Sequence, residues 1–222
     1  MKIMLACVLA ALVAVAAPAL AADPKTEDEK VLYAMGLIIS QNVAWFSLSE
    51  AELKMVEQGM ADGVLHKPQK IDLATYGPKI QELQRSRVAA LSSSEKKTGQ
   101  AFLDKAAAEK GATKTPSGIV VTTLKPGTGP QPAATDRVKV HYQGTLIDGT
   151  VFDSTLQRNE PVVFPLDKVI KCWGEGVQQM KVGGKSRLVC PAELAYGDRG
   201  AAPRIKPGAT LVFEIELLSI EK

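Results

Sequence analysis

Residues 136–154 read DRVKVHYQGTLIDGTVFDS, and this stretch decides the fold of the C-terminal half of the chain. Apolar side chains alternate with polar ones at Val138, Val140 and Tyr142, which is the pattern of a strand with one buried face. The Asp148-Gly149 pair then predicts a tight turn, because glycine readily takes the positive φ angles of short hairpin loops. The stretch therefore predicts two antiparallel strands joined by a hairpin.

Strand patterns continue on both sides of this hairpin. GIVVTTLKPG precedes it, and PVVF, KSRLVC and ATLVFEIELLSI follow it. One short helix is expected at residues 168–180, where Val169, Trp173, Val177 and Met180 share one helical face. A helix against about five antiparallel strands predicts an α+β fold, in which a half-barrel sheet wraps around the helix. Trp173 should then lie at the bottom of the concave face.

The N-terminal half has helical spacing instead. Helices are expected at residues 26–46 and from Ser49 onward, each with a Glu three residues after the Ser or Thr that caps it. A third helix is expected from Gly77-Pro78 to about Lys110. Its middle, residues 92–100, has almost nothing to bury, so we expect this helix to bridge two domains through solvent.

The first two helices offer too thin an apolar core to be stable alone. We expect them to bury their apolar faces against a second copy of the chain, and a compact monomeric three-helix unit is the alternative. The predicted division is a signal segment at 1–21, an all-α dimerisation domain at 22–76, a long connecting helix at 77–112 and the β-rich domain at 113–222.

The first 22 residues, MKIMLACVLAALVAVAAPALAA, resemble a secretory signal. A single Lys precedes an apolar run, and Ala19-Leu20-Ala21 forms a small-residue site that predicts cleavage after Ala21. A transmembrane helix is the alternative, because the run is about 20 residues long. The chain is therefore expected to be exported to the periplasm, with outer-membrane or surface association as a further option.

Composition excludes several classes of function. The net charge of +3 is small, and no basic stripe alternates with aromatic residues, which argues against a nucleic-acid partner. The chain has two His and no Ser-His-Asp or metal-spaced cluster, so neither a metal nor another cofactor is expected.

Three segments are similar to one known family: VKVHYQGTLIDGTVFDST at 138–155, VIKCWGEGVQQMKVGGKSRLVCPAELAYGDRG at 169–200, and PGATLVFEIELLSIEK at 207–222. In this order they resemble the FKBP-type peptidyl-prolyl isomerases over about residues 115–222. The signal-like start and helical half resemble its secreted macrophage infectivity potentiator-like branch. The resemblance implies an FKBP-like domain at 113–222 and a homodimer joined through the N-terminal helices.

The resemblance also implies a prolyl-binding pocket with Trp173 as its floor. Its walls would be Tyr142, Phe152, Phe164, Val169, Ile170, Tyr196 and Phe213. The Ile170 backbone N–H and the Tyr196 hydroxyl would bind substrate carbonyl oxygens. Asp153, hydrogen-bonded to Tyr142, would lie at the rim and act in catalysis with Tyr142, Phe152 and Tyr196.

Two further positions complete the implied substrate-binding set. Ile205 would lie on the loop over the mouth of the pocket. Val162 stands where many family members have an aromatic wall residue, a departure that bears on the tightness of the pocket and on the residue preferred before proline. Taken singly, aromatic residues such as Trp173, Phe164 and Phe213 are usually core residues. The ordered set is what predicts a site.

The chemistry implied needs no nucleophile. Rotation about an X–Pro bond faces a barrier of about 18–20 kcal/mol, because resonance keeps the amide planar. The twisted amide is less dipolar than the planar one, so a dry aromatic pocket disfavours the ground state more than the transition state.

Cys172 and Cys190 remain after removal of a signal segment that contains Cys7. Two cysteines in an exported chain predict a disulfide, and two buried free thiols are the alternative. The FKBP-like fold would lay the strand that ends at Cys190 beneath the start of the helix.

We therefore expect an exported, homodimeric peptidyl-prolyl cis-trans isomerase that assists the folding of proline-containing clients. The family's macrocyclic inhibitors should fit the pocket. The alternative functions are a non-catalytic chaperone or client-binding module that uses the same cleft, and a surface adhesion factor.

Overall fold

The computed structural model of the protein describes residues 23–221. The predicted signal segment and its cleavage site lie outside this range. The chain divides into two compact units, one that ends at Ser40 and one that begins at Gln41. Within the described range, no helix combines the length and the apolar character needed to cross a membrane.

The helices α1 (Glu27–Ser40) and α2 (Glu50–Val64) both begin where their capping residues predict. At α2 the Ser49 side chain accepts from the Glu52 N–H and the Glu52 carboxylate accepts from the Ser49 N–H, so the predicted capping box is confirmed. A single helix over 26–46 is wrong, because Gln41–Phe46 forms the 3-10 helix η1.

Helix α3 (Leu73–Ala107) begins earlier than the Gly77-Pro78 pair that was expected to start it. The Asp72 carboxylate accepts hydrogen bonds from the N–H groups of Ala74 and Thr75, at 3.1 and 3.0 Å. This cap supplies acceptors for N–H groups that no helical carbonyl can reach. Pro78 lies inside the helix, and the helix ends before Lys110.

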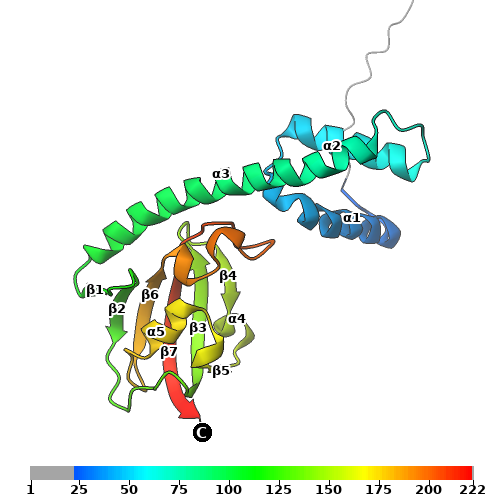
Figure 1. Ribbon diagram of the computed structural model, residues 1–222. Helices are drawn as coiled ribbons and strands as arrows, with labels where there is room; N and C mark the ends of the chain where they lie inside the picture. Colours follow the sequence, from blue (N-terminus) through cyan, green and yellow to red (C-terminus); the bar gives the residue numbers. More distant parts are fainter. Residues whose placement is uncertain (1–22, 222) are drawn as a thin grey trace, which may run out of the picture. The chain divides into compact units, whose positions relative to one another are not determined.

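An antiparallel sheet forms the C-terminal domain, with the strand order β1-β2-β6-β7-β3-β4 and with β5 paired to β3 (Figure 1). The strands are β1 (Ala112–Lys114), β2 (Val120–Lys125), β3 (Arg137–Leu146), β4 (Val151–Ser154), β5 (Val162–Pro165), β6 (Lys185–Cys190) and β7 (Leu211–Glu221). The predicted hairpin is confirmed: Gly149, at φ +88°, lies in the turn between β3 and β4. The seven strands exceed the five expected, and β1 begins at Ala112, which was predicted to be the end of the connecting helix.

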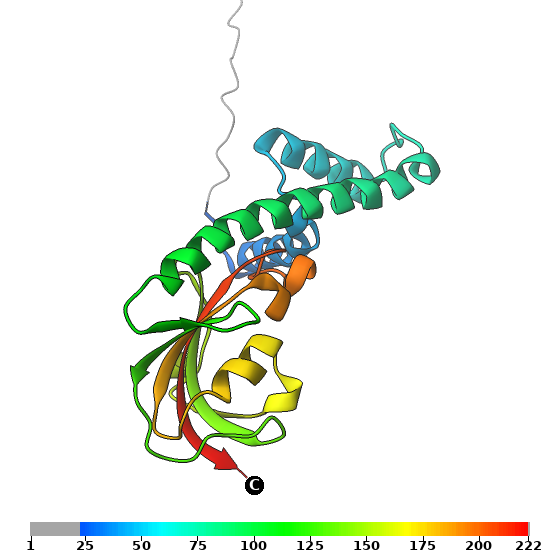
Figure 2. The same ribbon diagram turned by 60° about the vertical axis from the view of Figure 1, so that its left-hand side comes forward.

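One short helix, α5 (Lys171–Val177), covers the inner face of the sheet (Figures 1 and 2). It is shorter than the predicted 168–180. Val169 is extended, and the chain before it forms the 3-10 helix η2 (Leu166–Lys168). Smaller elements complete the domain: α4 (Thr155–Arg158), η3 (Ala192–Leu194) and η4 (Gly197–Arg199). Trp173 and Val177 of α5 belong to the core that fills the concave face, as expected.

The end of α3 covers the opposite face of the sheet. Leu103 and Ala106 pack with Val120, Val189 and Val212, whose side chains point away from the concave face. The expectation that residues 92–100 bridge through solvent is therefore wrong: Ser92 and Gly99 are buried. These small residues let the helix backbone approach the domain closely.

Polar contacts hold the same part of α3. The Ser92 hydroxyl donates to Asp198 at 2.6 Å, and the Lys96 ammonium lies 2.6 Å from Asp198 and 3.2 Å from Glu193. The hydrogen bond and charge of Lys96 lower the pKa of Asp198 below its usual range. Helix α3 is thus fixed to the turn that follows Tyr196.

Candidate active site

Trp173 forms the floor of an aromatic cluster on the concave face. It projects from the first turn of α5 and is only 4% exposed. Its ring meets Tyr142, Phe164 and Phe213 edge to face, with centroids 4.9, 5.6 and 5.4 Å apart. Such edge-to-face contacts fix ring orientation as well as burying apolar area.

The sequence holds this floor in place through two devices. The disulfide predicted between Cys172 and Cys190 is confirmed, and it ties α5 to the end of β6. Gly176 lets the helix approach β6, because a Cβ at this position would lie 2.6 Å from a methyl group of Leu188. The position of Trp173 is therefore fixed by a covalent bond next to it and by close packing one turn later.

A cavity of about 420 Å³ opens above the Trp173 ring. Its lining comes from β3, β4, β5, β7, the end of η2, the start of α5 and the loop after β6: Tyr142, Phe152, Asp153, Phe164, Lys168, Val169, Ile170, Trp173, Tyr196 and Phe213. All the predicted wall residues are brought together here. Gly144 of β3 makes room for two of them, because a Cβ there would lie 2.6 Å from the Phe152 ring and 3.0 Å from that of Phe213.

Two residues of the predicted substrate-binding set do not line this cavity. Ile205 is 5% exposed and packs into the core, where its backbone pairs with that of Ala201. Val162 lies on β5 opposite Val140 and is half-buried. Conversely, Lys168 lines the cavity although sequence reasoning omitted it. A single Lys before the helix carries no signal that would have found it.

One polar chain crosses the wall of the cavity. The Tyr142 hydroxyl donates to Asp153 Oδ2, and Arg158 Nη1 donates to Asp153 Oδ1 at 2.9 Å. Burial and the hydrogen bond to Asp153 raise the pKa of Tyr142 to about 12. Burial alone would raise the pKa of Asp153, but the Tyr142 hydrogen bond and the Arg158 pairing bring it below its usual range. At neutral pH this wall therefore presents a phenol and a compensated carboxylate.

Two hydrogen-bonding groups at the rim are free within residues 23–221. The Ile170 N–H precedes α5 and donates to no described group, whereas the Ile170 carbonyl accepts from Trp173 and Gly174. The Tyr196 side chain is 40% exposed, and its hydroxyl makes no hydrogen bond with the described residues. The rim can therefore donate two hydrogen bonds to carbonyl oxygens of a bound molecule.

Comparison with known proteins covers both halves of the chain. Residues 129–218 match the family model described as FKBP-type peptidyl-prolyl cis-trans isomerase. Residues 28–120 match that of the domain amino terminal to FKBP-type peptidyl-prolyl isomerase.

Similar curated proteins span nearly the same length. FKBP-type peptidyl-prolyl cis-trans isomerase FkpA of Aeromonas hydrophila is 40% identical over 213 residues, which cover 90% of this chain and 79% of that protein. The outer membrane protein MIP of Legionella longbeachae is 34% identical, over 89% of this chain and 87% of its own. The crystal structure of FkpA from Escherichia coli matches with a TM-score of 0.67 and 33% identity, over 89% of this chain and 98% of that one.

Proposed function

Because this chain belongs to the FKBP-type peptidyl-prolyl cis-trans isomerases, of the branch that includes FkpA and MIP, and is an enzyme of that class, we propose that the cavity above Trp173 is its active site. The observation that carries this proposal is the convergence of five aromatic side chains and a buried indole floor on one cavity of about 420 Å³. The prolyl ring of the substrate lies on Trp173, between Tyr142, Phe164 and Phe213.

The rim groups orient the substrate backbone. The Ile170 N–H has no partner within the described residues and donates to a carbonyl oxygen next to the prolyl ring. The Tyr196 hydroxyl donates to a second one. Two such bonds hold the peptide while the amide between them rotates, and orientation of this kind reduces the entropic part of a barrier.

The aromatic lining supplies the differential binding. The planar amide owes its stability to charge separation between its oxygen and nitrogen, and the twisted amide loses this separation. Carbon-rich walls solvate the planar form poorly, so the barrier falls relative to that in water. The Asp153 carboxylate, already paired with Tyr142 and Arg158, keeps the wall rigid and takes up no proton during the rotation.

The test is isomerisation of a short X–Pro peptide by the wild type, Asp153→Ala and Tyr196→Phe. Tyr196→Phe removes one hydrogen-bond donor, and a hydrogen bond contributes about 0.5–1.5 kcal/mol net. The kcat/KM of Tyr196→Phe should therefore be about two- to tenfold below that of the wild type. Tyr76→Phe is the matched control, because Tyr76 is similarly exposed, at 45%, but lies on α3. An equal loss in Tyr76→Phe, or none in Tyr196→Phe, would exclude Tyr196 from this role. No acceleration by folded wild type would favour the client-binding alternative.

The N-terminal half is proposed to form a homodimer. Neither α1 nor α2 contains a buried residue, and large apolar side chains are exposed on both, including Val31 at 61%, Ile38 at 65% and Val64 at 75%. Exposed apolar patches of this kind mark association surfaces. We assign the chain before α3 to dimerisation, α3 (Leu73–Ala107) to the connection and the sheet domain from β1 onward to catalysis, which moves both ends of the helix predicted at 77–112. Light scattering should give the mass of a dimer for the wild type and that of a monomer for Ile38→Glu. A monomeric wild type would contradict this proposal.

Export is proposed from the first 21 residues, with removal of residues 1–21 and release into the periplasm. The clients are then proline-containing exported polypeptides, and the macrocyclic inhibitors of the family bind in the same cavity. Mass spectrometry of the protein secreted by its host, expected to begin at Ala22, tests the cleavage. A chain that retains Met1 in the membrane fraction would contradict it.

A further inference from the structure

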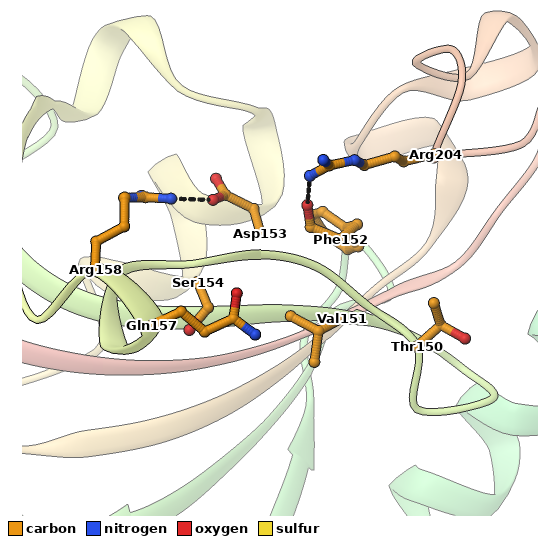
Figure 3. Close-up of a pocket in the computed structure, with 8 residues that line it drawn as sticks. All are labelled: Thr150, Val151, Phe152, Asp153, Ser154, Gln157, Arg158 and Arg204. Atoms are coloured by element: carbon orange, nitrogen blue, oxygen red, sulfur yellow. Dashed lines mark hydrogen bonds and ion pairs between the residues drawn. The ribbon is translucent and has the colours of Figure 1, made fainter. Parts of the chain in front are cut away.

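A second cavity of about 410 Å³ lies along β4, beside the proposed active site (Figure 3). It shares Phe152 and Asp153 with the first cavity but is mainly polar. Two arginines, Arg158 from α4 and Arg204 from the loop before β7, reach over β4 from opposite sides. The amide of Gln157 also faces this space. Gln157, Arg158 and Arg204 do not line the aromatic cavity.

Arg204 is held in place by its backbone and by one hydrogen bond. The loop around it is closed by the hydrogen bonds between Ala201 and Ile205, at 2.7 and 2.8 Å, and the Ile205 side chain is buried. Arg204 Nη1 donates to the Phe152 carbonyl at 2.7 Å. A guanidinium has five N–H donors, so several remain available after this bond.

The charge of the cavity is not balanced. Arg158 pairs with Asp153 at 2.9 Å, whereas Arg204 has no carboxylate within ion-pair distance among residues 23–221. Two guanidinium groups and one carboxylate leave one positive charge. An arginine fork with free N–H groups matches the geometry of a carboxylate. Val151, 37% exposed, adds an apolar surface for the methylene groups that carry such a carboxylate.

We propose that this cavity is a second binding site, which takes an acidic side chain of the polypeptide substrate close to its proline, and that Arg204 determines this preference. The proposal rests on the proposed active site, because only a chain that crosses the first cavity brings its flanking residues over β4. Arg158 contributes less to the carboxylate, since its charge is already shared with Asp153. The substrates preferred are therefore X–Pro segments with Glu or Asp near the proline.

The experiment compares pairs of peptides with blocked ends that differ by Glu or Gln, scanned through the four positions that flank X–Pro. At one position the wild type should favour Glu over Gln in kcat/KM by about threefold, the effect of one exposed ion pair. Arg204→Gln should bring this ratio close to 1, and Arg204→Lys should keep part of it. High salt should reduce the wild-type ratio, because exposed pairs are screened.

The matched control is Arg137→Gln. Arg137 is exposed and lies at the start of β3, whereas the residues of β3 that pair with β4 lie near its other end. Its Glu/Gln ratio should equal that of the wild type. A ratio near 1 at every position in the wild type overturns the proposal, as does a ratio that Arg204→Gln preserves. A further peptide carries a free C-terminal carboxylate and no acidic side chain. If the enzyme prefers only this peptide, the cavity binds a chain terminus and not an acidic side chain. Turnover of the Gln peptides tests the active site separately.

Discussion

The contact between α3 and the isomerase domain can be tested at Gly99. A Cβ at this position would lie 2.1 Å from Thr210 Oγ1 and 2.9 Å from Thr210 Cβ, and Thr210 is 4% exposed. Rotation of the Thr210 side chain moves its Oγ1 but leaves its Cβ in place. Gly99→Ala therefore requires a shift of the α3 backbone or of the chain that enters β7.

The magnitude follows from two opposing effects. Replacing Gly by Ala inside a helix stabilises it by about 1 kcal/mol. Overpacking a well-packed site costs about 1–3 kcal/mol. Gly59→Ala in α2 isolates the first effect, since no atom lies within 4 Å of its new Cβ. The free energy of unfolding of Gly99→Ala should thus fall below that of Gly59→Ala by about 1–3 kcal/mol.

The assay is urea-induced unfolding of the wild type and both variants, followed by far-ultraviolet circular dichroism. Hydrogen exchange of the amides between Ser92 and Ala107 checks that the loss arises where α3 meets the domain. Equal stability of the two alanine variants would refute the close approach of α3 to Thr210. So would a Gly99→Ala protein more stable than the wild type.

Three other predictions concern single covalent or ionic contacts, two within the isomerase domain and one between α2 and α3. Replacing both Cys172 and Cys190 with Ser should lower the free energy of unfolding by about 3 kcal/mol, the closure entropy of an 18-residue loop; an unchanged urea midpoint would contradict this. The pKa of Asp153 is below its usual value in the folded protein, so the stability that its carboxylate contributes is present at neutral pH and is lost as the pH falls below 4. Asp153→Asn should therefore be less stable than the wild type at pH 7 and should approach it at pH 3. A difference in stability that does not change with pH would argue against this. The Arg87 hydrogen bond and the Ser49 cap lower the pKa of Glu52 to about 2. An NMR titration of the Glu52 carboxyl should therefore have its midpoint far below 4.5, and a midpoint near 4.5 would exclude the ion pair with Arg87 of α3.

Local patterns in the sequence predict much of this fold because their causes are local. Asp148-Gly149 predicts the hairpin, and Ser49 with Glu52 predicts the start of α2, since the interacting groups are neighbours in the chain. The limits of α5 were less predictable. Val169 has helical spacing from Trp173, but it is extended, because the chain enters α5 from η2.

The contact of α3 with the domain could not be predicted from apolar spacing. Residues 92–100 look suited to solvent, because the helix meets the domain through Ser92 and Gly99, whose small size permits close approach. Lys168 was missed for a related reason: its place in the cavity depends on the fold around it. The aromatic walls were found only as an ordered set, since each alone resembles a core residue.

The walls of the aromatic cavity come from segments that are distant in the chain. Tyr142 and Phe213 are separated by 71 positions (213 − 142), and the sheet brings them together through the pairing of β3 with β7. Long-range pairing of this kind forms slowly, after the local helices. Catalytic activity is therefore a late signal of folding: during refolding the helical signal should recover first, and turnover should appear only when β7 has closed the sheet.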